Sequence, residues 1–363
     1  MFVDPSNVAY FLAERRLLTF DSVVDGDLMV VDQTSRNRNL KIVRRKSPGF
    51  FIKQVNFRSP EYTQSMGREA ACYRLAKQHP ELSALRALMP EFYYFDPINH
   101  ILIIELLNDG ESLWEYHRRA GCFPLEVAKL QGETLGSYHS QVSAEAVQTE
   151  AGVFARQIPW ILSLHETNPA YLGHVSRGNA QLIGILQQYP EFESALSMIK
   201  AGWNYTALIH GDIKWENMML CHDGDSPPRL KIIDWEIADI GDECWDVGAV
   251  IQAYLTFWVF SLPLSGGGGI AEAVTAAPLD AESIKLALAA YWNAYAERRG
   301  LDAGTSRPML ARCMSCAAAR MIQTAYESIQ ATPQISPYAL CKLQMSMNIL
   351  RNPEAATADF VGL

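Results

Sequence analysis

The N-terminal part of the chain alternates between apolar and polar positions with the two-residue period of β-strands. Residues 18–56 alternate in this way, and the clearest runs are residues 27–31, 40–43 and 49–54. Successive side chains of a strand point to opposite faces, so this alternation predicts strands with one buried face. A polar stretch, residues 32–39, separates the first two runs. We therefore expect three consecutive strands here.

A helix and a hairpin follow these strands. Residues 65–78 are rich in Ala, Arg and Glu, which predicts a helix, and Pro80 ends it. Two apolar runs, residues 92–95 and 101–104, flank a polar turn at residues 96–99. The first part of the chain is therefore predicted to be a small sheet with one helix.

Further along the chain the apolar spacing becomes mainly helical. Residues 125–142 and 150–203 contain helical patterns, and helical patterns dominate again after Asp246. Between them, residues 208–220 and 230–235 are strand-like and flank a polar turn. The remainder of the chain is thus expected to be mostly helical around two short strands.

The most membrane-like stretch is residues 247–264, which contains Gln252, Thr256 and Pro263 and is barely long enough to span a bilayer. It predicts a buried helix, and we expect no membrane association. Four glycines, Gly266–Gly269, follow this stretch. No Lys or Thr comes directly after them, so they predict a flexible loop rather than a phosphate-binding loop.

Composition excludes some classes of function. The chain has 363 residues, enough for one bilobal unit or two domains, and 49% of them are hydrophobic, which supplies a large core. Lys and Arg number 31 against 40 Asp and Glu, a net charge of −9, which argues against a nucleic-acid-binding protein. Residues 1–14 lack the basic start and apolar run of a signal peptide, so a cytoplasmic protein is expected.

The cysteines do not suggest a disulfide framework. They number seven and have no regular spacing, which fits a reduced, cytosolic protein. Cys313 and Cys316 have the spacing of half a zinc site. No second Cys or His pair follows, and the Ala-rich surroundings predict a buried helical face instead.

The strongest chemical signal is the run His210-Gly-Asp-Ile-Lys-Trp-Glu-Asn217, followed after a turn by Asp234. We call residues 210–217 the 210–217 loop. Phosphoryl transfer needs a group that orients the attacking hydroxyl and oxygen ligands for a magnesium ion. Asp212 can accept the hydroxyl proton, and Asn217 and Asp234 can bind the metal. The pattern therefore predicts a catalytic residue and two metal ligands in the order that phosphoryl transfer requires.

This arrangement resembles the protein-kinase-like superfamily over roughly residues 20–255. His-Gly-Asp212 in place of His-Arg-Asp, and Ile-Asp-Trp-Glu236 in place of Asp-Phe-Gly, resemble more narrowly the aminoglycoside phosphotransferases and their relatives, such as choline kinases. The resemblance implies a bilobal α+β fold with a small antiparallel-sheet N-lobe, residues 1–107, and a large, mainly helical C-lobe, residues 108–363. It also implies ATP as donor, with GTP as an alternative, and Mg²⁺.

The same resemblance implies roles for residues of the first lobe. A strand Lys binds the nucleotide phosphates in this family and a helix Glu holds that Lys; Lys53 and Glu69 occupy these places. Glu105 to Leu107 follow the last predicted strand of this lobe, where the family reads the adenine edge with backbone groups. A protein-kinase-type Gly-rich loop is missing from the sequence. Residues 34–39 stand in its place, and polar groups such as Ser35 are expected to contact phosphates.

Two further positions follow from the resemblance. Lys214 is the residue that Ser/Thr protein kinases have two places after the catalytic Asp, and a cation there would stabilise the transferring phosphoryl group. An exposed Lys is the alternative. Asp246 resembles the family's Asp at the start of a buried helix, which hydrogen-bonds the catalytic-loop backbone, and an ordinary helix cap is the alternative.

A short acidic run near the motif, Asp239, Asp242 and Glu243, leaves two interpretations open. It could attract a cationic acceptor, or it could be a solvated loop. The sequence does not choose between them.

The sequence thus predicts an ATP-dependent kinase with an alcohol group as acceptor, and three hypotheses about its substrate stay open. The acceptor is a small molecule such as an amino-sugar or amino-alcohol. Alternatively, it is a peptide Ser or Thr in natural-product biosynthesis, ahead of a lyase that eliminates the phosphate; Lys214 favours this. Less favoured is a non-catalytic nucleotide-binding protein. The acceptor, the choice of ATP over GTP and the oligomeric state are not set by the sequence.

Overall fold

The structure is a computed structural model and describes residues 2–33, 37–56, 59–222, 224, 226–264 and 270–363. Ser35 and the glycines Gly266–Gly269, singled out in the sequence, lie outside the described residues. The described part divides into two compact units. Unit 1 comprises Met1–Leu113, Ala146–Phe154 and Glu216–Ala238; unit 2 comprises Trp114–Glu145, Ala155–Trp215 and Asp239–Leu363. The predicted lobe boundary at residue 107 stays a prediction.

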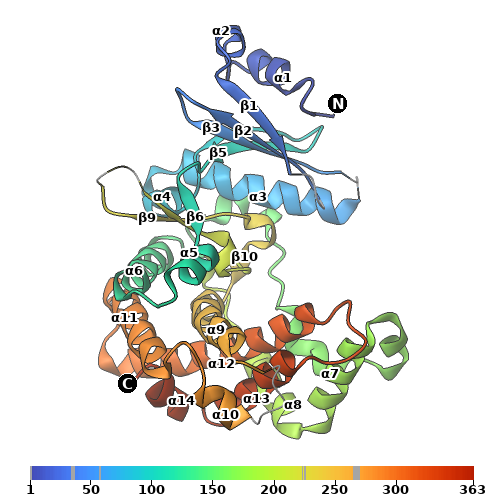
Figure 1. The fold of residues 1–363 in the computed structure, drawn as a ribbon, viewed down its shortest axis with the longest axis vertical. Coiled ribbons are helices and arrows are strands. Elements are labelled where there is room, and N and C mark those ends of the chain that lie inside the picture. The colour runs from blue at the N-terminus through green and yellow to red at the C-terminus, as the bar shows by residue number, and fades with distance from the viewer. Residues whose placement is uncertain (1, 34–36, 57–58, 223, 225, 265–269) are drawn as a thin grey trace. The chain divides into compact units, whose positions relative to one another are not determined.

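Unit 1 contains a five-stranded antiparallel sheet in the order β1-β2-β3-β5-β4 (Figure 1). Its strands are β1 (Leu28–Asp32), β2 (Arg38–Arg44), β3 (Gly49–Gln54), β4 (Phe92–Asp96) and β5 (Ile101–Leu106). The register of the central pair places Lys53 opposite Leu102. The three predicted strands and the predicted hairpin are therefore confirmed.

Helices cover this sheet on both sides. Helix α3 (Pro60–Gln78) begins five residues before the predicted start, because Pro60 occupies its first turn and the Ser59 side chain caps it by accepting from the Tyr62 N–H. On the other face, Phe11 and Leu12 of α1 (Val8–Glu14) join the core of the sheet. Figure 1 shows the sheet between α1 and α3.

The prediction that residues 18–56 alternate throughout like strands is wrong at its start. Residues Phe20–Val24 form a short helix, α2. Its apolar residues Phe20, Val23 and Val24 have the spacing of one helical face, and all three are exposed in the structure. Five residues are too few to distinguish the helical period from the strand period. Within the described chain, the exposed apolar residues also make no core contacts that would favour a strand.

The predicted strand over residues 208–220 is two strands in different units. In unit 2, β7 (Ala207–Ile209) pairs with β10 (Asp239–Gly241). In unit 1, β8 (Met218–Cys221) pairs with β6 (Gly110–Ser112) and β9 (Arg229–Ile232). The 210–217 loop connects β7 to β8 and ends in a single 3₁₀ turn, Trp215–Asn217.

Unit 2 is mainly helical, as predicted, and glycines allow close helix packing at two of its crossings. Its main helices are α5 (Leu113–Ala120, whose first residue belongs to unit 1), α6 (Leu125–Gln141), α7 (Arg177–Gln188), α8 (Pro190–Ala201), α9 (Glu243–Ser261), α10 (Ile270–Thr275), α11 (Ala281–Arg299), α12 (Ala303–Ser328), α13 (Pro337–Arg351) and α14 (Pro353–Phe360). A Cβ on Gly132 of α6 would lie 2.1 Å from the Tyr291 carbonyl oxygen of α11. A Cβ on Gly248 of α9 would lie 2.7 Å from the Cys313 carbonyl oxygen of α12.

The predictions made for two ambiguous stretches are confirmed. Residues 247–261 belong to the buried helix α9, and within the described chain no helix has the length and apolarity to cross a membrane. Cys313 and Cys316 are buried in α12. The α+β fold class, with an antiparallel sheet in the N-terminal part and a mainly helical remainder, is also confirmed.

Candidate active site

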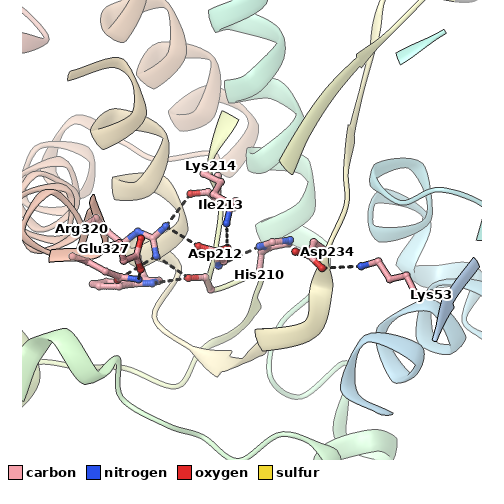
Figure 2. A network of polar contacts seen from close by, with 11 residues as sticks. Lys53, His210, Asp212, Ile213, Lys214, Asp234, Arg320 and Glu327 are labelled. Atoms are coloured by element: carbon pink, nitrogen blue, oxygen red, sulfur yellow. Dashed lines mark hydrogen bonds and ion pairs between the residues drawn. The ribbon is translucent and has the colours of Figure 1, made fainter. Parts of the chain in front are cut away.

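A cluster of three charged side chains, two of them buried, lies in unit 1. Lys53 on β3 donates to both carboxylate oxygens of Glu69 on α3, at 2.8 and 3.0 Å, and to Oδ1 of Asp234 at 2.7 Å. Figure 2 shows the Lys53 ammonium directed at Asp234. The side chain of Glu69 is 1% exposed and that of Asp234 is 35% exposed. The ion pair between Lys53 and Glu69 that the resemblance implied is therefore present, and Asp234 is added to it.

The pKa values in this cluster follow from burial and from the pairing. Burial alone would lower the pKa of Lys53, but the carboxylates of Glu69 and Asp234 outweigh it and raise that pKa. Burial raises the pKa of Glu69 to about 7, against the opposing effect of the Lys53 ammonium. One ammonium thus serves two carboxylates, and Asp234 is the more exposed of the two.

The two predicted metal ligands lie next to each other in unit 1. The β8–β9 pairing places Met218 opposite Ile232, and the Ile233 N–H donates to the Asn217 carbonyl oxygen at 3.0 Å. Asp234 follows directly and has left-handed backbone angles, φ 70° and ψ 58°, an arrangement that costs energy for a non-glycine residue. Hairpin pairing therefore brings the buried Asn217 and the strained Asp234 together.

This donor set fits a hard divalent cation. A carboxylate and an amide oxygen are ligands that Mg²⁺ accepts, and Mg²⁺ takes few ligands from protein when phosphates and water supply the others. Within the described residues, no group of three or more His, Cys, Asp or Glu side chains could hold a metal ion by itself. The pair Asn217 and Asp234 therefore suits a metal that arrives with a phosphorylated ligand better than a permanently bound structural metal.

Glu105 and Leu107 lie at the end of β5 and just beyond it, beside a cavity of about 580 Å³ in unit 1. The Glu105 side chain accepts a hydrogen bond from the Glu91 N–H at 3.0 Å, so it is engaged in holding the sheet edge. Residues Glu105 to Gly110 line the cavity. None of the described residues that line it belongs to the Lys53 cluster.

In unit 2, the backbone that carries Asp212 is fixed by Asp246 of α9. The buried Asp246 carboxylate accepts from the N–H groups of His210 and Gly211, at 2.7 and 3.0 Å. The Asp212 N–H donates to Nδ1 of His210 at 3.2 Å. The predicted clamp is confirmed, and the helix cap is instead Asp242, whose side chain accepts from the Cys244 N–H.

The Asp212 carboxylate lies between two cations. Lys214 donates to Oδ2 at 2.6 Å, and Arg320 of α12 lies 3.4 Å from Oδ1 (Figure 2). Burial would raise the pKa of Asp212, but Arg320 and Lys214 outweigh it and lower that pKa. Asp212 is therefore held in the ionised form that a proton acceptor needs.

Comparison with known proteins places this geometry in a family. Residues 30–300 match the model of the phosphotransferase enzyme family. The chain belongs to this family. Membership confirms the resemblance predicted from the sequence and the predicted enzyme class, a phosphotransferase with an alcohol group as acceptor. A comparison with curated protein sequences finds no match.

Solved structures share the fold of this phosphotransferase at low sequence identity. Amicoumacin kinase hAmiN, in complex with AMP-PNP, Ca²⁺ and amicoumacin, is 12% identical with a TM-score of 0.55, covering 94% of this chain and 96% of that one. Macrolide 2'-phosphotransferase MphH from Brachybacterium faecium is 16% identical with a TM-score of 0.50, covering 96% and 99%. The GDP complex of a mutant of aminoglycoside 2'-phosphotransferase-IIIa is 13% identical with a TM-score of 0.50, covering 91% and 92%.

Sequence reasoning missed Arg320 of the phosphotransferase. Its only signal was a charge in an otherwise apolar helical run, Cys316–Ile322. A charge buried in such a run requires a partner, but the partner, Asp212, lies 108 residues away in the sequence. The existence of a partner was therefore predictable and its identity was not.

Both interpretations of the acidic run in the phosphotransferase are wrong. Asp239 is buried and accepts from the N–H groups of Arg156 and Gln157. Asp242 is buried, caps α9 and pairs with Arg312, and Glu243 pairs with Arg299 at 2.7 Å. These carboxylates are neither solvated nor available to a cationic acceptor, because backbone N–H groups bind Asp239 and arginine side chains pair with Asp242 and Glu243.

Proposed function

We propose that the chain transfers the γ-phosphoryl group of ATP, with GTP as the alternative donor, to a hydroxyl group of a small molecule such as an amino-sugar or amino-alcohol. In this proposal, residues 1–107 bind the nucleotide, and residues 108–363 carry the 210–217 loop and bind the acceptor. The observation that carries the proposal is the Lys53 cluster. A buried ammonium held by two carboxylates at 2.7 to 3.0 Å is a fixed point charge for a nucleotide phosphate.

Each remaining residue has a proposed role. Glu69 holds Lys53, and Asp234 and Asn217 would hold Mg²⁺, which neutralises charge on the phosphates when bound. Backbone groups at Glu105 and Leu107 read the base, and Ser35 contacts phosphates. Asp212 takes the proton of the acceptor's hydroxyl group, and Lys214 moves its ammonium to the transferring phosphoryl group.

Two observations support a nucleotide donor and a small acceptor. Amicoumacin kinase hAmiN, which shares the fold, was solved with AMP-PNP, Ca²⁺ and amicoumacin. MphH, which also shares the fold, is named a macrolide 2'-phosphotransferase, and a macrolide is a small molecule. Lys214 does not favour a peptide acceptor, because its contact with Asp212 is compatible with either kind of acceptor.

The experiment is an acceptor screen with radiolabelled ATP and Mg²⁺. The panel holds aminoglycosides, macrolides, amino-alcohols and Ser- or Thr-containing peptides. Transfer of label to a small molecule supports the proposal, and transfer to a peptide replaces it with the peptide-kinase hypothesis.

Asp212→Asn is the matched control for that screen. It keeps the size of the side chain and removes the basic oxygen, so we expect turnover to fall at least about a hundredfold while nucleotide binding is retained. Equal label transfer by Asp212→Asn and the wild-type protein would remove Asp212 from the mechanism. No transfer and no ATP hydrolysis by the wild type would support the non-catalytic hypothesis.

A further inference from the structure

Arg320 lies on α12, and only 2% of its surface is exposed. Its chain neighbours Ala319 and Met321 are fully buried. A guanidinium does not lose its proton in proteins, so it cannot escape burial by becoming neutral. A buried charge is tolerated only when it is paired and hydrogen-bonded. The partners of Arg320 must therefore account for its position.

Those partners are concentrated on three consecutive residues of the 210–217 loop. Nη1 donates to the Gly211 carbonyl oxygen at 3.1 Å, and Nη2 donates to the Ile213 carbonyl oxygen at 3.0 Å. Nη2 also lies 3.4 Å from Oδ1 of Asp212 (Figure 2). The planar guanidinium thus binds the backbone on both sides of Asp212 and also contacts the Asp212 carboxylate.

Two neighbours hold the guanidinium itself. Nη1 lies 3.4 Å from Oε1 of Gln323, one helical turn along α12. The Trp245 ring lies 5.3 Å from Cζ of Arg320, and the Trp245 Nε1–H donates to the same Gly211 carbonyl oxygen at 3.1 Å. Arg320 is therefore restrained on its own helix and by α9, and it has little freedom to move.

The two oxygens of Asp212 are consequently unequal. Oδ1 faces the immobile, buried guanidinium, while Oδ2 faces Lys214, whose side chain is 45% exposed. We infer that Arg320 is a positioning residue that holds Oδ1 of Asp212 and so presents Oδ2 to the acceptor's hydroxyl group. This inference rests on the proposed function.

The step is then defined at one atom. The acceptor oxygen forms a bond to the γ-phosphorus, and the bond between that phosphorus and the β,γ-bridging oxygen breaks. The bridging oxygen leaves with the electron pair on the nucleoside diphosphate, and the hydroxyl proton moves to Oδ2 of Asp212. A carboxylate turned about its Cβ–Cγ bond would present neither oxygen correctly, so positioning alone is expected to change turnover.

The test uses Mg²⁺ and ATP with water as the acceptor, so it does not depend on the natural substrate. The variants are Arg320→Ala, Arg320→Lys and a matched control, Arg312→Ala. Arg312 lies eight residues earlier on the same helix and pairs with Asp242 and the Gly202 carbonyl oxygen, outside residues 210–217. Thermal melts report the folded fraction, and kcat and the KM for ATP are measured with and without millimolar methylguanidinium.

For Arg320→Ala we expect kcat to fall about a hundredfold with the KM for ATP within about threefold of wild type. Methylguanidinium should restore kcat at least about tenfold, because it can occupy the space the side chain vacates, and it should not affect Arg312→Ala. A loss confined to KM, or a kcat that methylguanidinium does not restore in the folded variant, overturns the inference.

If Arg320→Ala does not fold, the kcat of Arg320→Lys tests whether Arg320 positions Asp212. Its single ammonium keeps the charge but cannot reach both carbonyl oxygens and Oδ1, so kcat should still fall at least about tenfold. Wild-type kcat in Arg320→Lys overturns the inference. If Asp212→Asn also hydrolyses ATP like the wild type, the proposed function has failed; if only the Arg320 variants do, the inference alone has failed.

Discussion

The carboxylate of Asp246 accepts a hydrogen bond from the backbone N–H of His210 at 2.7 Å and from that of Gly211 at 3.0 Å. Asp246 is fully buried on α9, so the helix holds the start of the 210–217 loop through a charged acceptor without competing water. The loop therefore has a fixed point on α9 and, through Arg320, another on α12.

Asp246→Ala is expected to lower the free energy of unfolding by about 3 kcal/mol, because two buried N–H donors lose a charged acceptor. Asp246→Asn, which keeps one oxygen, should lose roughly half as much. Urea denaturation of both variants measures the difference. A loss below about 1 kcal/mol for Asp246→Ala would mean that the loop does not depend on this contact.

Lys53 and Glu69 should behave as a coupled pair in nucleotide binding. Glu69→Gln leaves the ammonium in place but held by Asp234 alone, so it should weaken ATP binding less than Lys53→Met does. The double variant should lose little beyond Lys53→Met, since residues in contact are not additive. Dissociation constants for ATP give the cycle, and strictly additive losses would mean that the pair does not act together.

Lys46→Met is the control for that cycle. Lys46 lies on the turn between β2 and β3 with a side chain 69% exposed, and its partner Asp25 is exposed too. Removing a Lys of that kind should leave ATP binding within about twofold, because exposed ion pairs contribute little. A loss equal to that of Lys53→Met would indicate a general effect of charge.

Asp234→Ala should reduce Mg²⁺-dependent nucleotide binding more than Asn217→Ala does. Asp234 offers a full negative charge, and Asn217 offers only an amide dipole. Titration of Mg²⁺ at fixed ATP should show the stronger effect for Asp234→Ala. The reverse order would exchange the proposed roles of the two residues.

His117 should make the stability of the protein depend on pH. It is fully buried, with Nδ1 3.0 Å from the Cys122 carbonyl oxygen, and burial lowers its pKa from 6.5 to about 4. The rings that surround it are those of Tyr116, Phe123, Trp215, Tyr254 and Phe257, which are uncharged near neutral pH.

Between pH 6.5 and 4 the unfolded chain takes up a proton at His117 and the folded protein does not, so the free energy of unfolding falls as the pH falls. From pH 7.5 to 5 the loss from this residue should be about 2 kcal/mol. His117→Phe should remove that part of the pH dependence. Urea denaturation at both pH values checks it, and an unchanged slope in His117→Phe would exclude His117 as the cause.

Local patterns predicted most of the fold because the strands around Lys53 and the long helices have clear periods. They failed where the pattern was short, at Phe20–Val24, and where one apolar run divided between two sheets, at β7 and β8. In the candidate site, Asp212, Asn217 and Asp234 stand in one segment of sequence and could be recognised together. Arg320, and the internal partners of Asp239 and Asp242, depend on contacts between distant helices and loops, which no local pattern encodes.

The close crossing of α9 and α12 at Gly248 links this chemistry to helix packing. Asp246, which holds the 210–217 loop, lies two residues before Gly248, and Arg320 lies three residues after Ala317, whose backbone nitrogen would be 2.8 Å from a Cβ at position 248. A methyl group there would push α9 and α12, and with them the two supports of the loop, apart. Position 248 therefore constrains the geometry of the 210–217 loop as well as the packing of the two helices, and a larger residue there would affect turnover together with stability.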